Sequence, residues 1–409
     1  MRRMAITPTK RLLCCFLLLL LLPGCVVSSP QINDLAIVTA VGIDSGDEPG
    51  EVRVTAQIVR AADARGQTGA PSGGIGQPIH SIAAEGRTIF EAIRNMARFS
   101  TRRIYWAHNF VIVMNDDYAK NGIADMIDFF TRNHQLRMRT WVLVTPDSAS
   151  ELVSTITGLE IIPGEGIDKL FRYNRIVAEA PRTNMMRLQE AFLNESTHPV
   201  IAKAELRGRG IPNKRPEQLG AIDQVELSGT AVFRGDKFIG YLSPSKSRSL
   251  LYFIEKVESA IYTLPCPTAA SGNNIYASFE MVGNRFSVEP AMENGKPSFR
   301  VRLSADFNFV ETGCRMPLQR MMPVLEEQLE EQIEKEFREF YRAVQGEYKV
   351  DVMKLGEVVH NRYPAQWNEI KERWKDLFPT VDITTQVDAD IRSTVLKVRS
   401  PISEKGEDE

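Results

Sequence analysis

The sequence predicts an α+β protein of more than one domain, in which mixed and antiparallel sheets are flanked by helices. The chain has 409 residues, of which 43% are hydrophobic and 25% charged, so it is long enough for two or three ordinary globular domains. Segments in which apolar and polar side chains alternate, as in half-buried strands, are interspersed with segments that have the apolar spacing of amphipathic helices. The first two strand segments adjoin as a hairpin, which excludes an entirely parallel sheet.

The first half of the chain contains both kinds of segment. Residues 33–44 form an apolar run and residues 51–59 alternate, with the turn sequence SGDEPG between them, so an antiparallel pair is expected. A helix over 85–99, a strand over 108–114, a helix over 116–132 and a strand over 139–145 follow. Residues 61–78 are rich in glycine, have almost nothing to bury, and are expected to form a mobile loop.

The second half begins after the basic, Gly/Pro-rich residues 207–220, which mark the expected domain boundary. We therefore expect an N-terminal α/β domain with a mixed sheet over 25–206 and a C-terminal α+β domain over 221–400, which could divide again near 265–295. The expected elements are a hairpin at Gly235–Asp236, a strand over 298–311, helices over 318–344 and 364–378, and a strand over 380–391. The acidic residues 401–409 are expected to be disordered.

One face of the long predicted helix carries five glutamates, at positions 326, 327, 330, 331 and 334. Carboxylates at this spacing could bind a divalent cation. A solvent-facing helix surface explains them better, and that is the prediction.

Four basic residues precede the uninterrupted apolar run 12–22, and Pro23-Gly24-Cys25 follows it directly. A membrane-spanning helix needs about 20 apolar residues, so this run is too short, and its layout is that of a secretion signal. The sequence Leu22-Pro23-Gly24-Cys25 resembles a bacterial lipobox, in which the cysteine thiol receives a diacylglyceryl group before cleavage. Residues 1–24 are therefore predicted to be a cleaved lipoprotein signal peptide, and Cys25 the lipid attachment site; an ordinary signal with an incidental cysteine is the alternative.

The number of cysteines and the net charge limit which cross-links and which partners the rest of the chain can have. Beyond the predicted signal and Cys25, only Cys266 and Cys314 remain, and they could form a disulfide or stay as two buried thiols. The predicted mature part has 46 basic and 52 acidic residues, an excess of negative charge that argues against a nucleic-acid partner.

No catalytic motif stands out. The five histidines, at 80, 108, 134, 198 and 360, lack metal-ligand spacing, and neither a G-x-S-x-G elbow nor a Walker A loop occurs. We expect no enzyme activity, cofactor or metal. The most unusual cluster is Arg103, Tyr105, Trp106, His108 and Asn109, between a helix and a strand; it predicts either a partner-binding patch or a cap on the core.

Several segments, taken in order, resemble the Ger(x)C family, the lipoprotein subunits of nutrient germinant receptors in spore-forming bacteria. They are Gly24-Cys25, Asn33-Asp34-Leu35-Ala36-Ile37-Val38, Gly42-Ile43-Asp44, Glu85-Gly86-Arg87-Thr88, Tyr105-Trp106-Ala107-His108-Asn109, Gly229-Thr230-Ala231-Val232-Phe233 and PAQWNEIKERWKDLFP. The chain departs from the family at Val26-Val27, where Trp-Asp is common, and at Phe110, where a basic residue is usual.

The resemblance implies a multi-domain α+β fold and a non-catalytic role in spore germination. It also implies membrane attachment through the N-terminal lipid and assembly with two integral-membrane receptor subunits at the outer face of the spore inner membrane. A solute-binding lipoprotein of an uptake system is the alternative, and it predicts two similar lobes around a cleft. A third hypothesis is that the chain is an enzyme of the cell envelope.

Overall fold

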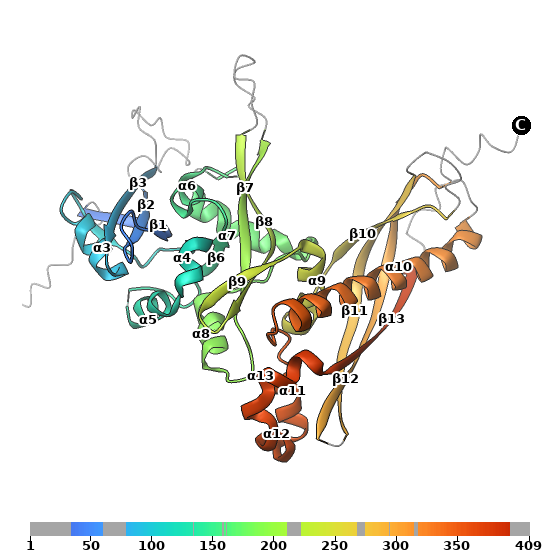
Figure 1. The fold of residues 1–409 in the computed structure, drawn as a ribbon. Coiled ribbons are helices and arrows are strands. Elements are labelled where there is room, and N and C mark those ends of the chain that lie inside the picture. The colour runs from blue at the N-terminus through green and yellow to red at the C-terminus, as the bar shows by residue number, and fades with distance from the viewer. Residues whose placement is uncertain are drawn as a thin grey trace, which may run out of the picture. The chain divides into compact units, whose positions relative to one another are not determined.

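A computed structural model describes residues 34–59, 79–133, 135–157, 159–160, 162–210, 222–267, 275–293, 295–314 and 318–392. Within them the chain is a mixed α/β protein with two sheets and helices packed on both (Figure 1). The predicted signal peptide, Cys25, the loop 61–78, His134 and the acidic tail lie outside the described residues.

The first sheet is mixed and has nine strands, in the order β3-β2-β1-β5-β6-β7-β8-β9 with β4 paired to β1. The strands are β1 (Leu35–Ser45), β2 (Val52–Val59), β3 (Ile79–Gly86), β4 (Arg103–Tyr105), β5 (Val111–Asn115), β6 (Trp141–Thr145), β7 (Val200–Gly210), β8 (Ile222–Arg234) and β9 (Lys237–Leu242). The expected β1–β2 hairpin is antiparallel, whereas β1, β5, β6 and β7 run parallel to one another. Of the residues expected to separate two domains, 207–210 belong to β7, and β7 pairs with β8, so this sheet continues to Leu242.

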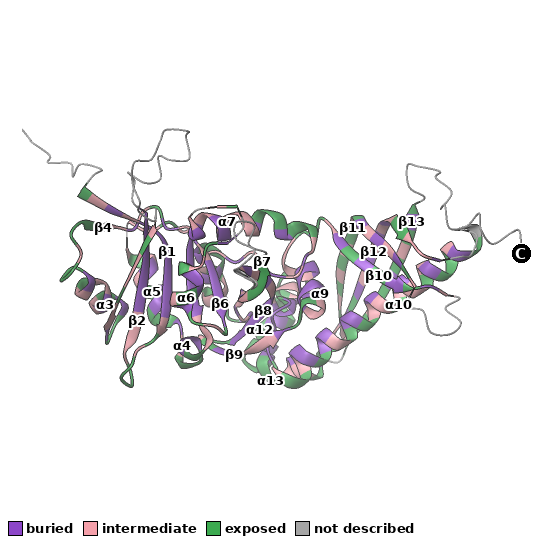
Figure 2. Ribbon diagram, turned by 90° about the horizontal axis from the view of Figure 1, so that it is seen from above, coloured by how far each residue is buried: buried purple, intermediate pink, exposed green. Residues whose placement is uncertain are grey.

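Helices cover both faces of this sheet. Val111 and Val113 of β5 pack with α6 (Ala149–Ser154) and α7 (Pro163–Tyr173). Their neighbours Ile112 and Met114 pack with α3 (Ile89–Met96), α4 (Asp116–Asn121), α5 (Ala124–Arg132) and α8 (Met185–Leu193). Because successive strand residues point to opposite faces, the sheet is the middle layer of three, and β1, β2 and β6 are buried along most of their length (Figure 2).

The helices of the first half differ from the prediction in two respects. The segment 116–132 is two helices, interrupted at Gly122, whose φ of 122° an L-residue rarely adopts. The helix expected over 85–99 begins at Ile89, because the Thr88 hydroxyl accepts a hydrogen bond from the Glu91 amide and caps it. Phe90 of this helix is 51% exposed.

The second sheet has the order β10-β11-β12-β13, with β10 (Ala260–Pro265), β11 (Tyr276–Glu293), β12 (Lys296–Thr312) and β13 (Asp382–Arg392). The predicted alternation in β12 is confirmed, since Phe299, Val301 and Leu303 are buried. The long helix α10 (Leu318–Tyr341) covers this face and continues into a π-helical turn, η4 (Arg342–Glu347) (Figure 1). The helices α9 (Pro244–Ile254), α11 (Leu355–Arg362), α12 (Pro364–Ile370) and α13 (Trp374–Leu377) complete this half.

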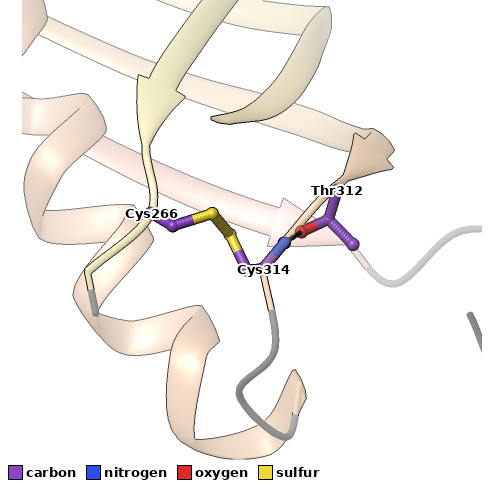
Figure 3. Close-up of a disulfide and its surroundings, with 3 residues drawn as sticks. All are labelled: Cys266, Thr312 and Cys314. Atoms are coloured by element: carbon purple, nitrogen blue, oxygen red, sulfur yellow. Dashed lines mark hydrogen bonds between the residues drawn. A yellow bond between two sulfur atoms is a disulfide. The ribbon is translucent and has the colours of Figure 1, made fainter. Parts of the chain in front are cut away.

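Cys266 and Cys314 are joined by a disulfide, with their Cα atoms 5.6 Å apart (Figure 3). Cys266 follows β10 and Cys314 follows β12, and the Cys314 amide donates to the Thr312 hydroxyl at 2.9 Å. The bond links residues 48 positions apart, and by the chain-entropy model a loop of that length stabilises the fold by about 4 kcal/mol.

The glutamates of α10 do not all face solvent, so the prediction for this surface is wrong in part. Glu326 accepts a hydrogen bond from the Ile391 amide at 2.9 Å, and Glu330 accepts one from the Ala389 amide at 3.0 Å. Both amides lie on β13, an edge strand of the sheet. The two carboxylates therefore satisfy backbone donors that an uncovered strand would offer to another chain.

Candidate functional site

The loops that contain the predicted cluster meet at one end of the first sheet. Since β1, β5 and β6 are parallel, the segments preceding β5 and β6 reach the same edge, beside the start of β1. The Phe110 amide donates to the Thr39 carbonyl at 2.9 Å, and the Trp141 amide donates to the Phe110 carbonyl at 2.9 Å. The Thr140 hydroxyl donates to the Asn109 carbonyl at 3.1 Å. We call the surface formed by residues 97–110 and 135–140 the amino-end surface.

The predicted cluster divides between the core and this surface. Trp106 is 5% exposed and packs in the cluster that includes α3 and α5, and Asn109 is also 5% exposed. The side-chain amide of Asn109 has no hydrogen-bond partner among the described residues. Arg103 and His108 are exposed, and the half-buried Tyr105 ring lies 6.1 Å from the His108 ring, centroid to centroid. Trp106 and Asn109 are thus buried, whereas Arg103 and His108 lie at the surface.

A half-buried carboxylate at the opposite end of β1 holds α6 in place. The Asp44 side chain accepts hydrogen bonds from the amides of Ala149, at 2.7 Å, and Ser150, at 2.9 Å. Burial raises the pKa of Asp44, while these two donors oppose the shift. Any side chain at Gly42 would meet the Ala149 backbone, because a Cβ there would lie 2.9 Å from its carbonyl atoms. The Gly42-Ile43-Asp44 segment therefore helps to pack α6 on the sheet.

Asp351 is a buried carboxylate that sequence reasoning missed. Its Oδ1 accepts hydrogen bonds from the amides of Met353, at 3.0 Å, and Leu355, at 3.2 Å. Its Oδ2 accepts them from the Gly356 amide, at 2.8 Å, and the Trp374 indole, at 3.1 Å. Burial raises the pKa of Asp351 to about 6, although the four donors favour the charged form. The carboxylate joins α11 to α13, and in sequence it is indistinguishable from any other aspartate in a loop.

A buried arginine, Arg248 of α9, interacts with other ionisable groups in the core. Its guanidinium lies 3.5 Å from the carboxylates of Glu179 and Glu336 and 4.8 Å above the Tyr262 ring. Burial raises the pKa of Glu336, while Arg248 opposes the shift. This network connects α9 and α10 with the loop before α8, so its charges are engaged in packing.

Two family models cover most of the chain. Residues 28–206 match the model described as "Spore germination protein N-terminal domain", and residues 228–395 match "Spore germination B3/GerAC like, C-terminal". The chain belongs to the GerAC family of spore germination proteins.

Similar members of this family occur in Bacillus subtilis (strain 168). Spore germination protein KC is 25% identical over 95% of this chain and 96% of its own length, and spore germination protein YndF is 24% identical over 92% and 94%. The crystal structure of the GerBC protein aligns with a TM-score of 0.54 at 17% identity, covering 88% of this chain and 99% of that one. This last likeness shows that the fold is shared.

Two features are absent from the described part of the GerAC-family chain. Its helices include none long and apolar enough to cross a membrane. No group of three or more His, Cys, Asp or Glu side chains in that part is arranged to hold a metal ion.

Proposed function

We propose that the chain is a non-catalytic, lipid-anchored subunit of a nutrient germinant receptor. The observation that carries the proposal is the pair of family models, which together take in residues 28–206 and 228–395 and begin three residues after Cys25. The lipobox-like sequence ending at Cys25 supplies an anchor directly in front of the matched region. Anchoring there holds the body at the outer face of the spore inner membrane, beside two integral-membrane receptor subunits.

The interior of the described part supports a non-catalytic role. The half-buried carboxylate of Asp44 and the buried carboxylate of Asp351 each accept hydrogen bonds from backbone or indole donors that hold helices in place. Arg248 and Glu336 are paired with each other inside the core. Buried groups with shifted pKa values are the usual candidates for catalysis, and here their donors and partners account for them structurally.

The two sheets support a receptor component more than a solute-binding protein of two similar lobes. The first sheet has nine strands in mixed orientation, whereas the second has four strands and a single covering helix, α10, on its buried face. We propose functional domains at 25–206 and 221–400; the two family models cover residues 28–206 and 228–395.

The experiment that tests the proposal is a Cys25→Ala exchange in the spore-forming host. Spores with this exchange should germinate more slowly with the nutrient that the receptor serves, since the body is no longer held at the membrane. Cys14→Ala and Cys15→Ala, in the segment removed from the precursor, are the matched controls and should leave germination unchanged. Unchanged germination of Cys25→Ala spores with every nutrient, in a strain without paralogous receptors, would refute the proposal.

A further inference from the structure

We propose that the amino-end surface is a cationic face that lies against anionic phospholipid headgroups of the membrane. The inference rests on the proposed function, because the anchor at Cys25 is what brings this face to the bilayer. It goes beyond that function by assigning an orientation to the body and a chemical partner to an exposed surface.

The charge of the amino-end surface is the first reason. Its two segments, 97–110 and 135–140, contain five arginines and no aspartate or glutamate. The arginines are Arg98, Arg102, Arg103, Arg137 and Arg139. All five are exposed, and none forms an ion pair with another described residue. Five unpaired guanidinium groups on one surface are available to bind phosphate groups.

The opposite end of the same sheet has the reverse charge. The turns and helix starts that follow β1, β5 and β6 carry Asp47, Glu48, Glu51, Asp116, Asp117, Asp147 and Glu151. The basic residues there, Arg53 and Lys120, are already paired with carboxylates. The chain as a whole has a net charge of −2, so the amino-end surface is a local exception. Such a separation of charge orients a protein at an anionic surface, with the acidic end directed away.

The position of the anchor is the second reason. Leu35, which begins β1, is ten residues after Cys25, and ten extended residues span at most about 35 Å. The amino-end surface surrounds the start of β1, since β4 pairs with β1 and the Phe110 amide bonds to Thr39. A lipid at Cys25 therefore keeps the start of β1 within about 35 Å of the bilayer.

An aromatic side chain on the same surface fits the membrane interface. Phe99 follows α3 and is 54% exposed, between Arg98 and Arg102 in the sequence. Aromatic rings favour the headgroup region, where their apolar surface leaves water while neighbouring basic groups contact phosphates.

The test is vesicle binding by the chain from residue 25 with Cys25→Ser, so that no lipid contributes. All three buried clusters lie between Ala36 and Ile391, so removal of residues 1–24 takes nothing from them. The variant is R102E/R103E/R137E/R139E. The matched control is R285E/R300E/R362E/R373E, which changes the net charge equally at exposed arginines elsewhere. Binding is measured by flotation with phosphatidylcholine vesicles, with and without about 30% phosphatidylglycerol.

Each basic residue near an anionic surface strengthens binding by roughly fivefold, so the variant should bind phosphatidylglycerol vesicles at least about tenfold more weakly. The control should bind like the parent, and binding should fall as salt rises from about 0.05 M to about 0.5 M. Equal losses in the variant and the control would overturn the inference, since net charge alone would then explain binding. Absence of vesicle binding by the parent would also overturn the inference. This holds even if R102E/R103E/R137E/R139E spores germinate poorly, since a protein partner would then use this surface.

Failure of this inference is distinguishable from failure of the proposed function. An unmodified Cys25 in mass spectra of the membrane-bound protein contradicts the proposed anchor and leaves the vesicle measurement unaffected. Acylated Cys25 together with absent vesicle binding contradicts only the assignment of the amino-end surface.

Discussion

Replacing Asp351 by asparagine is expected to lower the free energy of unfolding by about 4 kcal/mol at pH 7. The asparagine carbonyl can still accept from Met353 and Leu355 in place of Oδ1. Its NH₂ group, however, replaces Oδ2 and faces two donors, the Gly356 amide and the Trp374 indole. Both donors are buried, and leaving a buried donor without an acceptor costs about 1–3 kcal/mol.

Urea unfolding followed by tryptophan fluorescence measures this loss, because Trp374 donates directly to Asp351. Asp382→Asn is the matched control, since Asp382 is exposed at the start of β13, and it should change the midpoint little. A loss below about 1 kcal/mol in Asp351→Asn would refute the reasoning, because the carboxylate would then not be what holds α11 to α13.

Three further predictions concern the second half of the chain. Replacing both Cys266 and Cys314 by serine should lower the free energy of unfolding by about 4 kcal/mol, and a reductant should have the same effect on the parent and none on the variant. E326A/E330A should destabilise the protein by about 2 kcal/mol in urea unfolding by exposing the edge of β13, whereas E327A/E331A, at exposed positions of the same helix, should not. Burial raises the pKa of Glu336 above 4.5, so the contribution of Glu336 to the free energy of unfolding is present at low pH and is lost as pH rises. The free energy of unfolding of the parent relative to Glu336→Gln should therefore decline above about pH 4.5. A constant difference between the two proteins would contradict this.

Regular patterns allowed several elements to be predicted from the sequence. The alternation around Phe299, Val301 and Leu303 identified β12 because one face of that strand is covered by α10 and the other is not. The turn sequence SGDEPG identified the β1–β2 hairpin because turn residues lie directly between two paired strands. Both signals are local, so neither needs knowledge of distant residues.

Elements that depend on distant contacts could not be predicted. Gly122 interrupts the segment 116–132 where the β8–β9 turn meets it: the Ile123 amide donates to the Asp236 carbonyl at 3.0 Å. The role of Glu326 and Glu330 depends on β13 lying at the sheet edge beside α10, which the helical spacing does not reveal.

The candidate site was visible in part. The cluster from Arg103 to Asn109 was identified, but its division into buried Trp106 and Asn109 and exposed Arg103 and His108 required the structure. Arg137 and Arg139 join it only because β5 and β6 are parallel, which brings segments some 30 positions apart to one edge.

The measurement that tests the central claim most directly is the mass of the N-terminal peptide of the protein purified from spore membranes. The proposed function predicts a mature chain that begins at Cys25 and carries a diacylglyceryl group on its thiol. A chain that begins at another residue, or a Cys25 without lipid, would contradict the claim that this GerAC-family protein acts as a lipid-anchored receptor subunit.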